Sequence, residues 1–239
     1  MNVLKKYKRI LLKLSGEILA GDGKFGLNYP VIDEVCDEIA EIAQAGIEIA
    51  MVVGGGNFIR GARAVAQGMD RVRGDQMGML ATVINALALQ NALEQIGIPT
   101  RVQTAIEIRS VAEPFITRRA IRHLEKGRIL IFAAGTGSPY FSTDTAAALR
   151  ALEIKSDCLL KATKVNGIYD KDPVKFPDAK FMPEISFEDA FKLRLEVMDG
   201  AAFSLCMENK MPIVVFNVQN KGNLAKLLIV GERIGSVVS

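Results

Sequence analysis

The chain has 239 residues, 49% of them hydrophobic and 24% charged, a composition that is typical of a folded globular protein and excludes a disordered chain. Its 30 basic and 27 acidic residues leave a net charge of only +3, and aromatic residues make up 6% with no tryptophan. This balance excludes a dedicated nucleic-acid-binding protein, so we expect local positive sites instead.

Cys36, Cys158 and Cys206 lie far apart in the sequence. Three cysteines at such spacings form neither a zinc-ligand pattern nor a disulfide framework, and they indicate reduced thiols in the core. The basic start of the chain is not followed by an export signal, and no uncharged stretch reaches the length of a membrane span. We therefore expect a cytoplasmic protein with no membrane segment.

Short aliphatic and β-branched runs alternate with helical patterns along the chain. A strand is expected over 9–14, and Asn28 with Pro30 then opens a helix that Gly46 ends. The remaining elements expected, in order, are a buried strand over 47–53, a long helix over 75–96, a strand over 100–104, a helix over 117–126, a strand over 128–134, a helix over 143–152, a strand over 158–161, a helix over 201–209, a strand over 213–217, a helix over 222–230 and a strand over 236–238. The alternation predicts an α/β fold with a mostly parallel sheet and helices on both faces, in a single domain over 1–239.

Four polar segments follow predicted strands, and the first covers residues 13–17. In open α/β sheets ligands bind beyond the carboxyl ends of the strands, which is where such segments lie. Lys13 projects a positive charge there, while Ser15 and Gly16 let backbone N–H groups approach a phosphate. A solvated lysine beside an ordinary turn is the structural alternative.

The second segment, residues 54–61, begins with three consecutive glycines after a buried strand. Each glycine is conformationally expensive, and a backbone that closely follows a polyphosphate would need them. Arg60 adds a guanidinium suited to phosphate. The Lys-Ser/Thr pair of a Walker loop is missing, so the segment predicts a phosphate site of another kind.

The third segment, residues 135–144, begins like a dinucleotide-binding fingerprint, but Tyr140 replaces the third glycine. Ser142 or Thr143 can cap the next helix, whose free N–H groups attract an anion. Asp144 either stabilises the first turn of that helix or holds lysine side chains in position. A bare carboxylate beside phosphates would repel them.

The fourth segment, residues 160–173, brings hydroxyl, amide, aromatic and acidic groups together. Tyr169 suits the face of a purine ring and Asp172 suits ribose hydroxyls, with a simple polar connection as the alternative. Outside these segments, Asp75 is expected to open the long helix as its cap or first-turn acid, or to face ribose hydroxyls. His123, the only histidine, is interpreted as a surface residue.

Taken in order, these segments resemble the bacterial uridylate kinases, a branch of the amino acid kinase family. The resemblance runs from Tyr7 to Glu232 and includes the block 72–82 and the tripeptide 197–199. It implies a three-layer αβα sandwich with the acceptor site mainly in the N-terminal half and the ATP site mainly in the C-terminal half. It also implies transfer of the γ-phosphoryl group of ATP to UMP, giving UDP and ADP in pyrimidine nucleotide biosynthesis.

The resemblance implies the residues of the site as well. ATP is expected to contact Lys13, Leu14, Ser15, Gly16, Gly56, Arg60, Thr163, Asn166, Tyr169 and Asp172. UMP is expected to contact Gly55, Asp75, Thr136, Gly137, Ser138, Pro139, Tyr140, Phe141, Ser142 and Thr143. We expect Lys13 and Lys161 to neutralise charge during phosphoryl transfer while Asp144 orients both lysines. Mg²⁺ would be held mainly by the nucleotide phosphates, with no protein metal site.

The family resemblance further implies a homohexamer, activation by GTP and inhibition by UTP. The GTP site would involve Gly21, Asp22, Gly23, Lys24, Phe25 and Gly26 together with Arg101 and Arg128. Three alternatives stay open. They are a carboxylate or carbamate kinase of the same fold, a nucleotide-binding regulator without turnover, and a nicotinamide oxidoreductase, whose complete glycine fingerprint is missing here.

Overall fold

The computed structural model describes residues 7–23, 25–59 and 68–239, so Lys24 and Arg60, both expected at ligand sites, lie outside the described residues. The strands are β1 (Arg9–Leu14), β2 (Glu48–Val53), β3 (Thr100–Thr104), β4 (Glu113–Pro114), β5 (Ile129–Ala133), β6 (Cys158–Thr163), β7 (Ile168–Tyr169), β8 (Phe181–Met182), β9 (Glu184–Ile185), β10 (Ile213–Asn217) and β11 (Ser236–Val238). The helical elements are α1 (Gly16–Leu19), η2 (Gly21–Gly23), α2 (Tyr29–Gln44), α4 (Arg71–Gln95), α5 (Thr117–Glu125), α6 (Thr143–Glu153), α7 (Phe187–Lys192), α8 (Gly200–Glu208), α9 (Asn223–Ala225) and η3 (Lys226–Val230).

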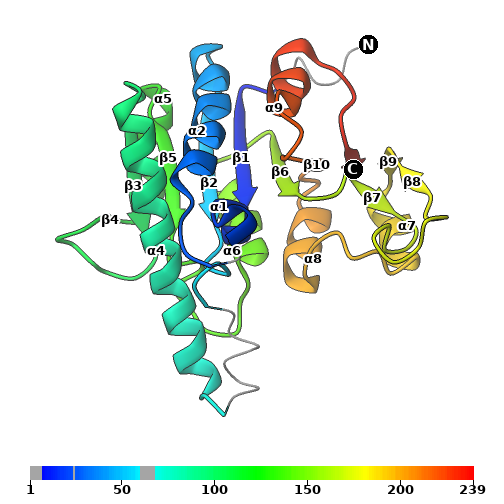
Figure 1. Ribbon diagram of the computed structural model, residues 1–239, viewed down its shortest axis with the longest axis horizontal. Coiled ribbons are helices and arrows are strands. Elements are labelled where there is room, and N and C mark those ends of the chain that lie inside the picture. Colours follow the sequence, from blue (N-terminus) through cyan, green and yellow to red (C-terminus); the bar gives the residue numbers. More distant parts are fainter. Residues whose placement is uncertain (1–6, 24, 60–67) are drawn as a thin grey trace.

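The central sheet has the strand order β4-β3-β5-β2-β1-β6-β10-β11-β9. Its neighbouring strands are parallel except for β10 and β11, which run antiparallel. Helices α1, α2, α4 and α9 pack on one face of the sheet, and α5, α6, α7 and α8 pack on the other (Figure 1). The predicted α/β fold with three layers is therefore confirmed.

The alternation of side chains along β1 assigns each residue to one face of the sheet. Ile10, Leu12 and Leu14 pack in the core beneath α2 and α4, whereas Leu11 packs in the core beneath α6. Lys13 follows the parity of Leu11, so its side chain emerges on the α6 face. Because β1 is buried on both faces of the sheet, its sequence is a nearly continuous run of apolar residues.

The long helix α4 begins at Arg71, four residues before its expected start. Asp70 is the N-cap, and its Oδ1 accepts a hydrogen bond of 3.1 Å from the backbone N–H of Arg73. The prediction that Asp75 opens the helix is therefore wrong. Gly74 followed by an aspartate has the composition of a helix boundary, but Gly74 is buried inside the first turns of α4. Figure 1 shows this end of α4 extending well beyond the sheet.

Several short elements were not expected. They are α1, η2, α7 and the two-residue strands β4, β7, β8 and β9. The helix expected over 222–230 is a three-residue α9 followed by a π-helical turn, η3. Apart from the start of α4, the other expected strands and helices are present, with ends that differ by at most two residues.

His123 is buried, which corrects its interpretation as a surface residue. Only 7% of the residue is exposed, and its Nε2 lies 3.0 Å from the Glu113 carboxylate on β4. Arg128 donates to the other ring nitrogen, Nδ1, at 3.1 Å. Because arginine can only donate, Nδ1 is the acceptor and Nε2 carries the proton towards Glu113.

All three cysteines are buried free thiols, as expected. Burial raises the pKa of Cys36 and of Cys206 to about 12, so these thiols stay protonated and unreactive. Within the described part of the chain, no helix combines the length and the apolar character needed to cross a bilayer.

Candidate active site

The four predicted polar segments meet at one edge of the sheet. Strands β5, β2, β1 and β6 are consecutive in the sheet and parallel to one another. Their carboxyl ends therefore lie at the same edge of the sheet, the lower one in Figure 1. Each of these strands leads directly into one of the segments. The first and fourth segments lie more than 140 residues apart in the sequence. The parallel topology brings them together.

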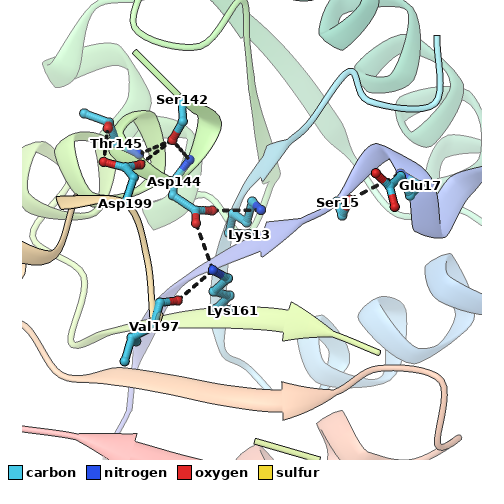
Figure 2. A network of polar contacts seen from close by, with 9 residues as sticks. All are labelled: Lys13, Ser15, Glu17, Ser142, Asp144, Thr145, Lys161, Val197 and Asp199. Atoms are coloured by element: carbon cyan, nitrogen blue, oxygen red, sulfur yellow. Dashed lines mark hydrogen bonds and ion pairs between the residues drawn. The ribbon is translucent and has the colours of Figure 1, made fainter. Parts of the chain in front are cut away.

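Lys13, Asp144 and Lys161 form a compact charged cluster at this edge (Figure 2). Lys13 and Lys161 occupy paired positions on β1 and β6, so both ammonium groups emerge on the α6 face. Asp144 lies between them, with Oδ1 2.8 Å from Lys13 Nζ and Oδ2 2.9 Å from Lys161 Nζ. The side chains are 11%, 15% and 17% exposed, in the order Lys13, Asp144, Lys161. The shared carboxylate offsets the repulsion of two adjacent, largely buried ammonium groups.

The pKa of Asp144 reflects this position. Burial acts to raise the pKa, but the charges of Lys13 and Lys161 and their hydrogen bonds outweigh it, and the pKa lies below the ordinary aspartate value. Asp144 is therefore ionised at neutral pH. It can hold the two lysines in place, and it is too weak a base to take a proton from a substrate.

The amino terminus of α6 is fixed by a second group of contacts, also visible in Figure 2. Ser142 caps the helix, because its hydroxyl accepts from the N–H of Asp144 at 2.9 Å and of Thr145 at 3.2 Å. Asp199, which caps α8, accepts from the Ser142 hydroxyl and, at 2.8 Å, from the Thr145 hydroxyl. Lys161 Nζ also donates to the carbonyl oxygen of Val197 at 2.6 Å.

Asp199 and Val197 had no predicted role, although they belong to the tripeptide that contributes to the family resemblance. Together with Ser142 they tie α6 and α8 to the lysine cluster. The position of Asp144 therefore depends on residues more than 50 positions away in the sequence.

The glycine segment after β2 is required for close packing. A Cβ on Gly55 would lie 2.6 Å from the carbonyl oxygen of Gly78 on α4, and a Cβ on Gly16 would lie 2.5 Å from that of Gly54. Those distances are shorter than real contacts, so no larger residue fits without movement of the backbone. Close approach to a polyphosphate is thus not the sole reason for these glycines. Gly56, whose Cβ would meet only Glu17 at 3.5 Å, has room for a side chain.

Two buried asparagines, which the sequence analysis did not identify, support the glycine segment. Asn85 on α4 donates to the Gly54 carbonyl at 2.6 Å and to Asn57 Oδ1 at 2.8 Å. Asn57 donates back to Asn85 Oδ1 at 2.9 Å and to the Gly26 carbonyl at 2.7 Å. Both residues are almost fully buried, at 0% and 1% exposure. The paired amides donate hydrogen bonds to backbone carbonyl oxygens that would otherwise be buried without a partner.

A cavity of about 150 Å³ lies between α4 and the loop before α6. Asp75 fixes that loop, because its Oδ2 accepts from the backbone N–H of Tyr140 and from Arg71 Nε, both at 2.8 Å. Tyr140 itself has a positive φ of 70°. The residues predicted to contact UMP that line this cavity are Gly55, Asp75, Thr136, Ser138, Phe141, Ser142 and Thr143, whereas Gly137, Pro139 and Tyr140 belong to the same loop without lining it.

A larger cavity of about 520 Å³ reaches Lys161 from the C-terminal half of the chain. Of the residues predicted to contact ATP, Thr163, Tyr169 and Asp172 line it. The Tyr169 ring packs against Phe181 with the ring centroids 5.4 Å apart. Lys13, Leu14, Ser15, Gly16, Gly56 and Asn166 do not line this cavity. Leu14 is fully buried beneath α2, so only its backbone can face a ligand at the strand end.

The residues predicted to bind GTP are not adjacent within one chain. Arg101 is the second residue of β3 and Arg128 precedes β5, which places both at the amino edge of the sheet. Of the segment 21–26, the described residues Gly21, Asp22, Gly23, Phe25 and Gly26 follow α1 at the carboxyl edge. A GTP site that uses all of them would therefore have to form between chains.

The fold and the site together define a class of nucleotide-using phosphotransferase. Residues 8–217 match the amino acid kinase family, and the chain belongs to that family. It is similar to the crystal structure of UMP kinase from Bacillus anthracis, with 37% identity, a TM-score of 0.94 and coverage of 98% of this chain and 96% of that one. It is also similar to UMP kinase from Ureaplasma parvum, with 36% identity, a TM-score of 0.92 and coverage of 98% and 99%. Uridylate kinase from Archaeoglobus fulgidus has 25% identity, a TM-score of 0.72 and coverage of 96% and 99%.

Proposed function

We propose that this chain is a uridylate kinase, which transfers the γ-phosphoryl group of ATP to UMP and releases ADP and UDP. The observation that carries the proposal is the Lys13–Asp144–Lys161 cluster at the junction of two cavities. Thr143, next to Asp144, lines the smaller cavity, and Lys161 lines the larger one. We assign UMP to the smaller cavity, because most of the residues expected to contact UMP line it, and ATP to the larger cavity, which Thr163, Tyr169 and Asp172 line.

The proposed reaction needs positive charge rather than a base. An oxygen of the UMP phosphate forms a bond to the γ-phosphorus, the bond to the bridging oxygen breaks, and ADP leaves with that electron pair. The attacking phosphate is already an anion, so no proton has to be removed from it. Lys13 and Lys161 stabilise charge on the phosphoryl group and on the leaving oxygen. Asp144 supplies the orientation of both lysines.

Mg²⁺ would enter with ATP as part of the substrate. In the described residues, no group of three or more His, Cys, Asp or Glu side chains is arranged to hold a metal ion. The central carboxylate, Asp144, is already shared by two lysines, and Asp199 accepts from two hydroxyls. These donors fit a cation carried by phosphate oxygens better than one resident on the protein.

The assay that tests the proposal measures ADP release from Mg·ATP with UMP, CMP, dUMP, AMP and N-acetylglutamate offered separately. We expect strong turnover with UMP and little with the others. Turnover with N-acetylglutamate would overturn the acceptor assignment and favour a carboxylate kinase of the same fold. ATP binding without turnover on any acceptor would contradict an enzymatic function and favour a regulator.

We also infer that the chain forms a homo-oligomer. Met77, Leu80 and Ile84 on α4 are 42%, 49% and 47% exposed and follow helical spacing, which makes an apolar stripe suited to a second copy. The family resemblance favours a homohexamer, with GTP as activator and UTP as inhibitor. The same resemblance favours one domain in a cytoplasmic enzyme, with the acceptor cavity mainly from the N-terminal half.

A further inference from the structure

A third cavity, of about 280 Å³, lies on the face of the sheet opposite the lysine cluster. Leu12 and Leu14 of β1 line it, while Lys13 between them points to the other face. The cavity is bounded by α1, α2 and the turn before α9, and it shares no lining residue with the two cavities above. Its volume is near the lower end of the roughly 300–1,000 Å³ that ligand pockets occupy.

The cavity has an apolar floor and an acidic mouth. The floor is made by aliphatic side chains of β1, α1, α2 and α9, which include Leu14, Ile18, Val31, Val35, Ile39 and Leu224. The mouth contains four carboxylates and two ammonium groups, namely Glu17, Asp22, Glu34, Glu38, Lys164 and Lys221. Lys221 is engaged by Glu34 at 2.8 Å. Glu17 has an interaction of its own, but among the other described residues of the mouth three carboxylates still outnumber two ammonium groups, and this excess disfavours a nucleoside triphosphate or any other polyanion.

Glu38 is the most distinctive of the acidic groups. It lies on α2, half-buried, and its carboxylate accepts from the backbone N–H of Gly222 at 2.9 Å. Burial raises its pKa, as do the nearby Glu41 and Glu34, whereas the Gly222 hydrogen bond and the charge of Lys221 lower it, and the net effect is a raised pKa. Among the described residues, no cationic side chain forms an ion pair with Glu38. Lys221, whose charge does act on Glu38, is paired with Glu34, so a ligand cation would give the Glu38 carboxylate a direct partner.

We propose that this cavity binds a small organic cation with an aliphatic body, such as an alkylammonium ion. The ammonium group pairs with the Glu38 carboxylate and the alkyl chain covers Val31 and Val35. This inference does not depend on the proposed kinase activity, because binding can be measured without substrates.

The test is a titration of the full-length protein followed by backbone amide NMR, with n-pentylammonium as the probe. Two matched probes of the same chain length, 1-pentanol and pentanoate, separate the contribution of charge from that of apolar contact. We expect saturable shifts at α2 and Gly222 with pentylammonium, an affinity about fivefold weaker for pentanol, and no binding of pentanoate. Equal affinity for pentanol, shifts confined to the other cavities, or no saturable shift would each overturn the proposal.

Two substitutions locate the site. Glu38→Gln keeps the acceptor for Gly222 and removes the charge, so pentylammonium should bind about fivefold more weakly, at the level of pentanol. Glu41→Gln is the control, because Glu41 is exposed on the same helix and lines no part of the cavity. Val35→Phe should fill the cavity and abolish binding, provided that thermal unfolding shows the variant to be folded. Unchanged pentylammonium binding in Glu38→Gln would contradict the assignment.

Discussion

At the scale of single residues, the central observation is that two lysines on adjacent strands share one carboxylate. The register places Lys13 beside Lys161, and the first turn of α6 places Asp144 between them. Like charges held so close are unfavourable in a folded protein unless they are compensated. A bound phosphate chain would add further compensation, which explains why a phosphotransferase retains the arrangement.

Lys13→Ala should lower kcat for UDP formation by about 100-fold or more, as expected when an electrostatic group that stabilises a transition state is removed. Steady-state kinetics with Mg·ATP and UMP measure the effect, and circular dichroism confirms the fold. Lys8→Ala is the matched control, because the Lys8 side chain is 82% exposed and the residue lies just before the opposite end of β1. Unchanged turnover in Lys13→Ala would remove this lysine from the mechanism.

Asp144→Asn should destabilise the protein at pH 7 by about 3 kcal/mol, because it leaves two largely buried ammonium groups without their carboxylate. The folded-state pKa of Asp144 is depressed, so its contribution is full above the unfolded pKa of about 3.9 and is lost as the pH falls through the folded value. The difference from the parent should therefore stay constant from pH 8 to about pH 5 and shrink below about pH 4. Urea unfolding across that range measures it.

Asp178→Asn provides the control for that series. Asp178 also pairs with a lysine, Lys171, but its side chain is 76% exposed, so its removal should change stability by less than about 0.5 kcal/mol at each pH. An equal loss of unfolding free energy in both variants would mean that the buried cluster stabilises the protein no more than an exposed ion pair does.

The residues of the cluster were predictable because Lys13 and Lys161 lie near the carboxyl ends of two clear strands and Asp144 lies in the first turn of a helix. Asn57, Asn85 and Asp199 were not, since their partners lie 28 to 57 positions away and only the packed fold brings them together. His123 was misplaced for a similar reason. Its burial depends on Glu113 from β4, a two-residue strand that carries no sequence pattern.

At the scale of elements, hydrophobic periodicity located the long strands and helices, and capping residues gave several of their ends. Asn28 and Gly46 bound α2 as expected, because a cap acts through its immediate neighbours. The start of α4 was misjudged because both Asp70 and Asp75 have the chemistry of a cap, and only the hydrogen bond to Arg73 distinguishes them. Strands of two residues, such as β7 to β9, are too short to show a period.

Gly235, just before β11, illustrates how one element depends on a close contact. Its φ is 82°, and a Cβ there would lie 2.2 Å from the carbonyl oxygen of Val215 on β10. Gly235→Ala should therefore destabilise the protein by about 3 kcal/mol, the sum of backbone strain and overpacking. Urea unfolding at neutral pH measures the change.

Gly222→Ala is the matched control for Gly235→Ala. Gly222 has nearly the same φ, 80°, but a Cβ there would meet no atom within 4 Å. Only the strain of the left-handed conformation remains, so the loss should be about 1 kcal/mol. Equal losses of unfolding free energy in the two variants would show that the backbone at Val215 moves to accommodate the added methyl group at no cost.

At the scale of the whole molecule, alternation of strands and helices was enough to predict a mostly parallel, three-layer fold. The position of the site followed from the same topology, because parallel strands deliver their carboxyl ends to one edge. The two cavities could not be predicted, since their walls come from α4, the loop before α6 and the short strands around Tyr169. Their shapes depend on packing between segments that are distant in sequence.

Leu80→Glu should reduce self-association, because it places a charge in the exposed apolar stripe formed with Met77 and Ile84 on α4. Size-exclusion chromatography with light scattering should show a smaller mass than the parent at the same concentration. Val230→Glu, which alters another exposed aliphatic residue on η3, should leave the mass unchanged. A parent that is already monomeric, or a Leu80→Glu variant of unchanged mass, would contradict an interface on α4.

Strand β11 lies between β10 and the short edge strand β9 in the central sheet. Within the described residues β9 joins the sheet only through β11, and the buried Ser236 hydroxyl accepts from the N–H of Ile168 beside the larger cavity. Local unfolding that detaches β11 would therefore free β9 from the sheet and remove the hydroxyl that accepts from Ile168. Ile168 and Val215, which both contact Ser236 of β11, line the larger cavity, so the wall of that cavity depends on β11 staying in place. A ligand bound in that cavity would accordingly slow amide hydrogen exchange along β11.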